Sequence, residues 1–268
     1  MASKEDDFCI FTGKLHKAMQ DFNKKIFLFL FLCCIAACQP AIYKKQRSEQ
    51  KFIEVNKALQ PDAAIEAMIL PYKQKIDAEM NRIIGTAARE LPKQREAREL
   101  LLGNFVADLT FERAQSFRKD LDLAFVTSGG LRVPIAKGAV KVADIFELMP
   151  FENELVIVEL EGEALQQFLQ YVVSRRNISV SNLTMRIEQG QIKEVLIGGK
   201  PLEARPYSLA TSDYLANGGD DMGFLLQRKS LLSTEVKVRD MIIEHIEKLS
   251  KEGKMVDAQY KGNIIEQQ

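Results

Sequence analysis

The chain has 268 residues, of which 46% are hydrophobic and 28% are charged, a composition typical of a globular protein with a core of its own. Its 37 Lys and Arg residues balance its 37 Asp and Glu residues, so no basic surplus exists to attract nucleic acid. This balance argues against a nucleic-acid binder but leaves room for a small anionic ligand held by one or two arginines.

The first part of the chain, residues 1–38, has the pattern of a bacterial lipoprotein leader. Lys24 and Lys25 form a positive region, and an apolar run over residues 26–37 follows. That run is too short for a transmembrane helix, which needs roughly 20 apolar residues, but it suits a signal peptide. It ends in Ile-Ala-Ala before Cys38, which resembles a lipobox, so we expect cleavage there and acylation of Cys38. An ordinary signal peptide or a buried apolar strand is the alternative.

The start of the leader and the cysteines fit export. Met19 would begin a more typical leader than Met1, so residues 1–18 are interpreted as an over-extended start. All the cysteines lie at or before the expected cleavage point: Cys9, Cys33, Cys34 and Cys38. We therefore expect an exported protein without disulfides, held by its lipid on a membrane that faces the periplasm. Residues 39–60 form the expected tether, and Gln39 is compatible with the outer membrane of a Gram-negative bacterium.

Beyond the tether, hydrophobic periodicity predicts a mixture of helices and strands. A helix over 61–80 has Asp62 near its start as a cap and contains Pro71, which is expected to kink or divide it. The other expected elements, in chain order, are a strand over 82–91, a helix over 94–117, a strand over 121–127, a helix over 142–148, a strand over 155–160, a helix over 162–174, a hairpin of strands over 183–187 and 192–197, a strand over 207–211 and a helix over 234–249.

The long helix over 94–117 is predicted to be amphipathic, with Leu101, Phe105, Leu109 and Phe117 facing the core. The mixture of elements indicates the α/β (α+β) class, here as a layered domain with mixed sheets. The expected regions after the tether are a linker-type helix over 61–82, a domain over 83–252 and a polar tail over 253–268.

The sequence lacks the residues of several catalytic centres. Its two histidines are His16, within or before the leader, and His245, on a helix rich in Glu and Lys where we expect a solvated surface residue. A phosphoesterase with two adjacent metal ions usually takes several histidine ligands. The sequence also has no nucleophile-elbow serine, no Gly-x-x-x-x-Gly-Lys loop and no dinucleotide fingerprint. We therefore expect no metal or other cofactor bound by this chain, and no hydrolysis by the chain alone.

Three glycine-centred segments and one aromatic segment are candidates for a binding site. They are residues 102–108 (LGNFVAD), 127–132 (TSGGLR), 148–153 (LMPFEN) and 214–220 (YLANGGD). Gly129 and Gly130 follow a buried-type strand, where glycine allows a sharp turn and a close approach to a ligand. Arg132 then presents a planar fork suited to a phosphate. Taken alone, this pattern is more simply a tight turn with an exposed arginine.

Aromatic and acidic residues add a second set of candidates. Phe151 and Tyr214 each end an apolar run beside turn residues, where a ring stays partly exposed, and two such rings on facing loops can sandwich a nucleobase. Asp220 follows two glycines, and its carboxylate can accept hydrogen bonds from a ribose diol. Core packing of the rings and a turn-stabilising role for Asp220 are the alternatives.

Together, in order and spacing, these segments resemble the carboxy-terminal domain of the 5'-nucleotidase and UDP-sugar hydrolase family. The resemblance covers residues 61–250, and the 61–80 helix is similar to the helix that joins the two domains of that family. The roles that it implies are a base clamp by Phe151 and Tyr214, a ribose contact by Asp220, a base contact by Asn153 and a phosphate contact by Arg132.

This chain departs from the family at three positions. Tyr214 stands where many relatives have phenylalanine, which should still stack, and Thr127 stands where they often have Asn or Ser. Glu96 takes the place of an arginine that binds phosphate in relatives, with Arg95 and Arg98 nearby. The expected binding set is completed by Thr127, Gly129, Gly130, Arg98 and Asn104.

In that family an amino-terminal metallophosphoesterase domain does the chemistry and the carboxy-terminal domain grips the nucleoside. The resemblance therefore implies a split enzyme, in which this subunit recognises a nucleotide or nucleoside. A separately encoded metallophosphoesterase partner then supplies the divalent metals, and tethering of both to one membrane raises their effective concentration. The alternatives are a stand-alone nucleotide-binding lipoprotein that acts as receptor or sensor, and a relic whose site has decayed.

Overall fold

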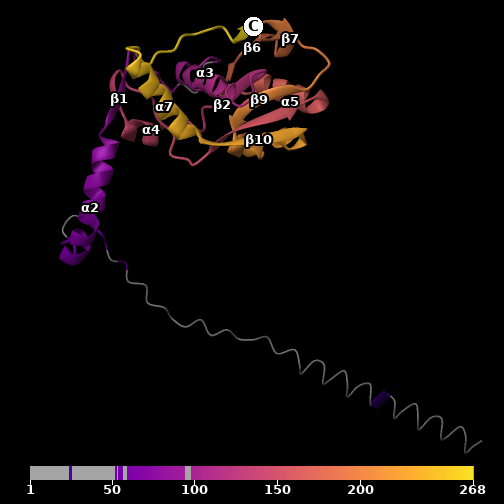
Figure 1. The fold of residues 1–268 in the computed structure, drawn as a ribbon. Coiled ribbons are helices and arrows are strands. Elements are labelled where there is room, and N and C mark those ends of the chain that lie inside the picture. Colours follow the sequence, from indigo (N-terminus) through magenta and orange to yellow (C-terminus); the bar gives the residue numbers. More distant parts are fainter. Residues whose placement is uncertain (1–23, 26–51, 53, 57–58, 94–97, 268) are drawn as a thin grey trace, which may run out of the picture. The chain divides into compact units, whose positions relative to one another are not determined.

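The computed structural model describes residues 24–25, 52, 54–56, 59–93 and 98–267 (Figure 1). The predicted lipidation site, Cys38, and the leader apart from Lys24 and Lys25 lie outside these residues. Residues Pro61–Gln268 form one structural unit. None of the helices within the described ranges is long and apolar enough to span a bilayer.

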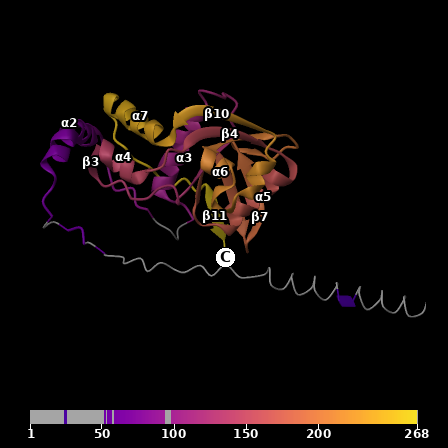
Figure 2. The same cartoon turned by 90° about the horizontal axis from the view of Figure 1, so that it is seen from below.

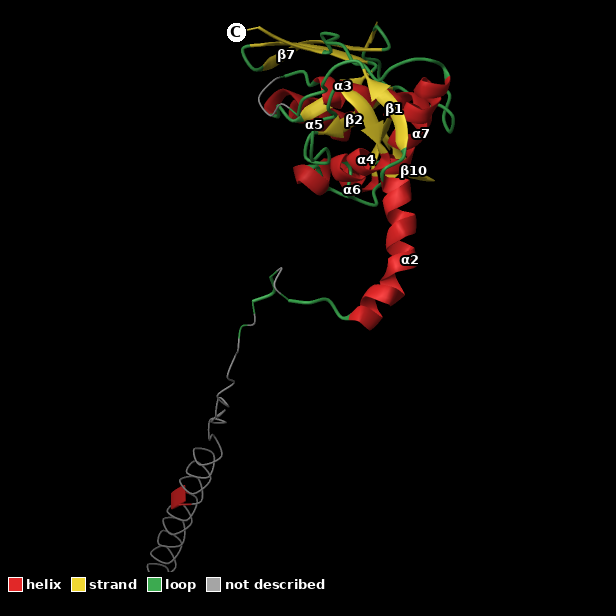
Figure 3. Cartoon of the chain, turned by 90° about the vertical axis from the view of Figure 1, so that its left-hand side faces the viewer, coloured by secondary structure: helices red, strands yellow, loops and turns green. Residues whose placement is uncertain are grey.

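Helix α2 (Ala63–Met80) begins where the sequence predicts, because Asp62 caps it. One carboxylate oxygen of Asp62 accepts hydrogen bonds from the backbone N–H groups of Ala64 and Ile65, at 2.8 and 3.1 Å. The helix is a single element that continues through Pro71 and is not divided there (Figure 3). None of its residues is buried, and its exposed apolar side chains include Ile65, Met68, Ile69 and Tyr72.

The strands of the described region form three sheets. The central sheet has five strands in the order β10-β4-β9-β2-β5, a second sheet has four in the order β11-β6-β7-β8, and β1 pairs with β3. Their bounds are β1 Ile83–Ala87, β2 Leu123–Thr127, β3 Gly138–Lys141, β4 Glu154–Leu160, β5 Ile178–Ser181, β6 Leu183–Glu188, β7 Gln191–Ile197, β8 Lys200–Pro201, β9 Tyr207–Ser212, β10 Ser230–Lys237 and β11 Ile264–Gln267.

The central sheet lies between two hydrophobic cores, because successive residues of a strand point to opposite faces. On β2, Leu123 and Phe125 enter one core and Ala124 enters the other. The core of Ala124 is completed by helices α3 (Leu101–Ala114), α4 (Val142–Leu148) and α7 (Val238–Lys251). The core of Leu123 is completed by helix α5 (Gly162–Ser174) and the second sheet (Figure 2). The predicted layered α/β class with mixed sheets is confirmed.

Several predicted elements are confirmed, but the long helix is shorter than predicted. Helices α4 and α5 and the β6–β7 hairpin lie where the periodicity places them. Helix α3 begins only at Leu101, because the side chains of Arg98 and Glu99 bind other segments of the domain instead. It is buried on almost all sides rather than amphipathic. Phe117 lies beyond its end and is 42% exposed, so the prediction that it faces the core is wrong.

The carboxy-terminal part of the domain contains the other differences. Residues 234–237, predicted as the start of the last helix, belong to β10, which pairs antiparallel with β4. Residues 253–268 were expected to be a polar tail, but Ile264–Gln267 form β11, which pairs parallel with β6. Strand β10 has a largely polar and exposed sequence, and β11 is short, so both depend on distant partners rather than on local pattern.

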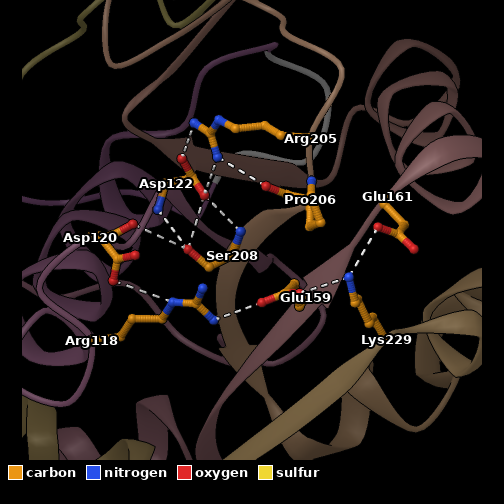
Figure 4. Close-up of polar contacts among 9 residues, drawn as sticks. All are labelled: Arg118, Asp120, Asp122, Glu159, Glu161, Arg205, Pro206, Ser208 and Lys229. Carbon is orange, nitrogen blue, oxygen red and sulfur yellow. Dashed lines mark hydrogen bonds and ion pairs between the residues drawn. The ribbon is translucent and has the colours of Figure 1, made fainter.

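A polar network fixes the starts of β2 and β9 beside each other (Figure 4). The Asp122 carboxylate accepts hydrogen bonds from the Ser208 backbone N–H at 2.8 Å and from the Arg205 guanidinium at 2.7 Å. The Asp122 backbone N–H in turn donates to the Ser208 carbonyl at 3.2 Å. Burial alone would raise the pKa of Asp122, but the bonds from Arg205 and Ser208 outweigh it and hold the pKa below its usual value. The ionised carboxylate therefore stabilises the pairing of these two parallel strands.

We predict that Asp122→Asn lowers the free energy of unfolding by about 1.5–3 kcal/mol at pH 7, because it removes charge-assisted hydrogen bonds. The pKa of Asp122 is lower in the folded protein than in the unfolded chain. The ionised carboxylate therefore stabilises the fold above the unfolded pKa, and this stabilisation is lost as the pH falls through the folded pKa. Denaturant titrations of both forms at pH 7 and in acid measure the difference. Asp120→Asn is the matched control, because its carboxylate is exposed. If Asp122→Asn lowers the free energy of unfolding at pH 7 by no more than Asp120→Asn does, Asp122 does not stabilise the pairing of β2 and β9.

Candidate functional site

Three loops meet at the edge of the central sheet opposite the Asp122 network. Strands β2 and β9 are parallel, so their carboxyl ends lie at the same edge. Strand β4 runs antiparallel to β9, and its first residues pair with the last residues of β9, with Leu155 opposite Ser212. The segments that follow β2 and β9 and the segment that precedes β4 are therefore neighbours. These are the segments that contain the glycine and aromatic motifs of the sequence.

An open cavity of about 310 Å³ lies where these loops meet. Its lining consists entirely of residues that were predicted from the sequence as binding residues: Gly129, Gly130, Arg132, Phe151, Asn153, Tyr214 and Asp220. The volume is at the lower end of the range typical of small-molecule pockets, roughly 300–1,000 Å³. The topology thus brings together residues that are far apart in the sequence.

Both aromatic rings of the pocket are accessible. Phe151 is 41% exposed and Tyr214 is 51% exposed. Two such rings on the wall of one cavity give it exposed, flat apolar surfaces. Core packing, the alternative interpretation of these residues, does not describe their environment.

Asp220 is held by groups from outside its own turn. Its backbone has a φ of 53°, in the left-handed region that few non-glycine residues adopt. Thr127, at the end of β2, donates a hydrogen bond from its hydroxyl to one carboxylate oxygen at 2.7 Å. The Tyr214 hydroxyl donates to the other oxygen at 3.2 Å, and the Tyr171 hydroxyl of α5 donates to the Asp220 carbonyl at 2.9 Å. Burial, followed by the charge of Asp220, raises the pKa of Tyr171, which keeps its hydroxyl a donor.

Of the two glycines after β2, Gly129 leaves room for this arrangement, whereas a side chain at Gly130 would make only an ordinary contact. A Cβ on Gly129 would lie 3.2 Å from the carboxylate of Asp220, and a Cβ on Gly130 would lie 3.6 Å from the Met149 side chain. The backbone N–H of Arg132 donates to the Leu148 carbonyl at 2.8 Å, which ties this loop to the end of α4. The guanidinium of Arg132 is exposed, and one nitrogen donates to the Gly129 carbonyl at 3.4 Å.

A buried arginine that was not predicted from the sequence fixes the loop that carries Phe151. Arg239, in the first turn of α7, is only 7% exposed and stacks over the Phe146 ring at 4.1 Å. Its guanidinium pairs with Glu152 and donates to the Met149 and Phe151 carbonyls, each at 3.5 Å. No motif in the sequence indicates this role, because it depends on α7 packing against a loop about ninety residues earlier in the chain.

Asp213 fixes the adjoining loop and was also missed. One of its carboxylate oxygens accepts hydrogen bonds from the backbone N–H of Glu154 at 3.0 Å and from that of Tyr214 at 2.8 Å. It therefore links the end of β9 to the start of β4 directly beside the two rings. The sequence indicates this role only by placing an acidic residue directly before the YLANGGD segment.

Three of the predicted binding residues, Thr127, Arg98 and Asn104, lie outside the lining of this cavity, although Thr127 is bonded to Asp220. Arg98 donates to the Val173 carbonyl at 2.7 Å near the end of α5 and forms an ion pair with Glu266 of β11 at 2.8 Å. Asn104 is buried and donates to the Glu99 carboxylate and to the Gln259 carbonyl. The bonds of Arg98 therefore join the segment before α3 to α5 and β11, and the bonds of Asn104 join α3 to Gln259. Arg95 and Glu96 lie outside the described residues.

A second cleft, of about 230 Å³, lies between α3 and α7 and contains His245. The His245 ring packs edge-on against Phe105 at 5.7 Å, so it is partly buried rather than solvated as predicted. Burial lowers the pKa of His245, against the opposing charge of Glu112. In the part of the chain that the structure describes, no group of three or more His, Cys, Asp or Glu side chains is placed to hold a metal ion. This cleft has charged walls but no exposed aromatic ring.

The sequence of residues 83–227, more than half of the chain, matches the family described as "5'-nucleotidase, C-terminal domain". The chain belongs to this family. The match extends from the first residue of β1 to the end of the segment that follows Asp220, so it includes every loop of the cavity. The resemblance predicted from the motifs is confirmed.

The relatives of this 5'-nucleotidase C-terminal domain are longer proteins. The chain is 27% identical over 213 residues to a 5'-nucleotidase of Vibrio vulnificus (76% of this chain, 37% of that protein). It is 26% identical over 195 residues to protein UshA of Yersinia enterocolitica (70% of this chain, 35% of that protein). The chain thus spans little more than a third of the length of these relatives.

Solved structures agree on the fold. The 5'-nucleotidase precursor of Thermus thermophilus has a TM-score of 0.63 and 25% identity, over 75% of this chain and 42% of that chain. The NAD nucleotidase of Haemophilus influenzae has a TM-score of 0.60 over 77% of this chain and 42% of that chain. Its 17% identity supports the fold alone.

We predict that Arg239→Met loosens the loop that carries Phe151. The substitution keeps the apolar stem but removes the donors that hold the Met149 and Phe151 carbonyls. The backbone N–H groups of Met149 and Glu154 flank this loop and are hydrogen-bonded, so they report its opening by hydrogen exchange. We expect faster exchange at both.

The matched control is Arg118→Met, at the opposite end of the sheet, where Arg118 pairs with Glu159 at 3.1 Å. That variant should leave exchange at Met149 and Glu154 unchanged. Equal exchange in wild type and Arg239→Met at these two amides would show that Arg239 does not position the loop.

Proposed function

We propose that this domain is the nucleotide- or nucleoside-recognition subunit of a split 5'-nucleotidase-like phosphohydrolase. One observation supports it most strongly: two exposed rings, an amide, an arginine and a carboxylate, contributed by three loops, line a single cavity. This combination suits a nucleotide, with flat apolar surfaces for the base, an acceptor for the sugar hydroxyls and a cation for the phosphate. The family match supports the same substrate class.

In this proposal each side chain has one role. Phe151 and Tyr214 stack on the base, and Asp220 accepts hydrogen bonds from the ribose. Asn153 contacts the base edge, and its side-chain amide makes no hydrogen bond to any residue in the described ranges, so its donors and acceptor are free for a ligand. Arg132 binds the phosphate, since a single 3.4 Å bond to Gly129 leaves most of its guanidinium donors available.

The residues of this chain do not fit the divalent metal centre that hydrolysis of a phosphate ester requires in this family. The whole sequence has two histidines, and the described residues include no cluster of three possible ligands. We therefore assign the metal ions to a separate metallophosphoesterase chain, and assign to this chain recognition of the base and ribose, with a contact from Arg132 to the phosphate. The positions of Phe151, Tyr214 and Asp220 then fix the nucleotide so that its phosphate is presented to the partner.

The proposal includes an exported location. Cleavage before Cys38 and acylation of that residue would hold the domain on a membrane that faces the periplasm, by way of residues 39–60. A partner anchored in the same membrane would meet this domain at a raised effective concentration, which relaxes the affinity that the pair needs.

We predict that Phe151→Ala and Tyr214→Ala each weaken adenosine binding by about 1–3 kcal/mol, because each removes one stacking surface. Calorimetric titration of the purified chain with adenosine measures the effect. Phe117→Ala is the matched control, since Phe117 is as exposed as Phe151 but lies outside the cavity. Unchanged affinity in both pocket variants would refute the clamp.

We further predict that the chain alone, with manganese or zinc added, releases no phosphate from adenosine monophosphate. Addition of a metallophosphoesterase domain protein from the same organism should produce release, and Asp220→Ala in this chain should reduce that release by raising the KM for the nucleotide. Robust turnover by the chain alone would contradict the assignment of the metals to a partner. Adenosine binding without release in any mixture would instead indicate a stand-alone binding protein.

A further inference from the structure

The hydroxyl of Tyr214 makes two contacts that a stacking ring alone does not require. It donates to one carboxylate oxygen of Asp220, Oδ1, at 3.2 Å, and accepts from the Asp220 backbone N–H at 3.3 Å. The ring lies directly over Gly219, where a Cβ would come within 2.5 Å of its Cε1 and Cζ atoms. Tyr214 is therefore folded against the loop that carries Asp220, with its hydroxyl on the carboxylate.

The two oxygens of the Asp220 carboxylate have partners of different kinds. Oδ2 is bonded at 2.7 Å to Thr127, which is 5% exposed and forms the end of β2. Oδ1 is bonded to Tyr214, which is half exposed and forms part of the cavity wall. Thr127 is buried, so its hydroxyl can turn away from Oδ2 only if the side chains packed around it move. Tyr214 is half exposed and can leave by rotating its side chain, so Oδ1 exchanges its partner more easily than Oδ2.

We propose, building on the nucleoside-binding function proposed above, that Tyr214 is a latch on Asp220. In the ligand-free pocket its hydroxyl satisfies Oδ1, and a ligand with a vicinal diol replaces it there. A carboxylate has about four lone-pair sites, so the competition is mainly for the space beside Oδ1 that the folded tyrosine fills. A diol must displace the tyrosine hydroxyl from Oδ1 before it binds there, so the latch lowers the preference of Asp220 for sugars that carry a vicinal diol.

The size of this preference depends on the hydrogen bonds that each ligand gives to the carboxylate in place of the tyrosine bond. A ribose diol supplies two new donors and offsets the loss of the tyrosine bond. A sugar without these hydroxyls leaves the tyrosine on Oδ1, or removes it and leaves Oδ1 without a donor from ligand or protein, which costs binding energy. The hydroxyl of Tyr214 is thus a specificity-determining group, distinct from the ring on which the base stacks.

The test compares adenosine with 2',3'-dideoxyadenosine by calorimetry, in the purified full chain and in Tyr214→Phe. The two ligands share the base and differ only in the diol. Without the competing hydroxyl, adenosine should bind roughly three- to tenfold more tightly, the equivalent of about one net hydrogen bond, while dideoxyadenosine should bind as in wild type. Tyr260→Phe, which removes the hydroxyl of an exposed tyrosine outside the cavity, is the control and should change neither affinity.

A second variant releases the latch without removing the hydroxyl. In Gly219→Ala the new methyl group displaces the Tyr214 ring from its folded position, and the backbone of Gly219 does not have a positive φ that would exclude alanine. The ratio of the adenosine affinity to the dideoxyadenosine affinity should rise as it does in Tyr214→Phe. Any change in stacking affects both ligands and cancels in this ratio.

The outcomes separate the latch from the function on which it rests. A rise in the ratio in both variants supports the latch. Measurable binding of adenosine to wild type with an unchanged ratio in both variants, or a weaker adenosine affinity in Tyr214→Phe, overturns the latch and leaves the nucleoside pocket standing. Failure of wild type to bind either nucleoside overturns both.

Discussion

The register of β9 between its two neighbours is the constraint on which the rest of this structure depends. Because β2 lies parallel to β9 and β4 lies antiparallel to it, the end of β2, the end of β9 and the start of β4 share one edge. Asp122 and Ser208 fix that register at the far end of the strands, and Asp213 fixes it at the near end. A slip of one residue would turn every side chain of β9 to the opposite face and separate the loops of the cavity.

The cavity combines residues that the fold holds firmly with residues that it leaves accessible. The left-handed backbone of Asp220 costs free energy, and hydrogen bonds from Thr127, Tyr171 and Tyr214 compensate for it. The two rings, in contrast, keep about half of their surface exposed. The domain therefore loses part of the free energy that burial of this apolar surface would contribute. Strain and exposed apolar surface at the same place are a common property of binding sites, where the ligand supplies the missing contacts.

The sequence predicts the members of the site better than its supports. Gly129 and Gly130 follow a strand that is recognisable from its apolar run, and the Gly-Gly pair before Asp220 follows the short helix α6 (Asp213–Ala216). Paired glycines in such places indicate a sharp turn or a close approach of the backbone. The supporting residues Arg239 and Asp213 act through contacts with segments far away in the chain, which no local pattern records. The same reason explains the missed strand β10 and the structural bonds of Arg98.

The central claim is that Phe151, Tyr214 and Asp220 form one nucleoside site. A crystal structure of the chain grown with adenosine tests it most directly. The account predicts the base between the rings of Phe151 and Tyr214, with a ribose hydroxyl within hydrogen-bond distance of the Asp220 carboxylate. Adenosine bound elsewhere, such as in the cleft between α3 and α7, with this cavity empty, would contradict it.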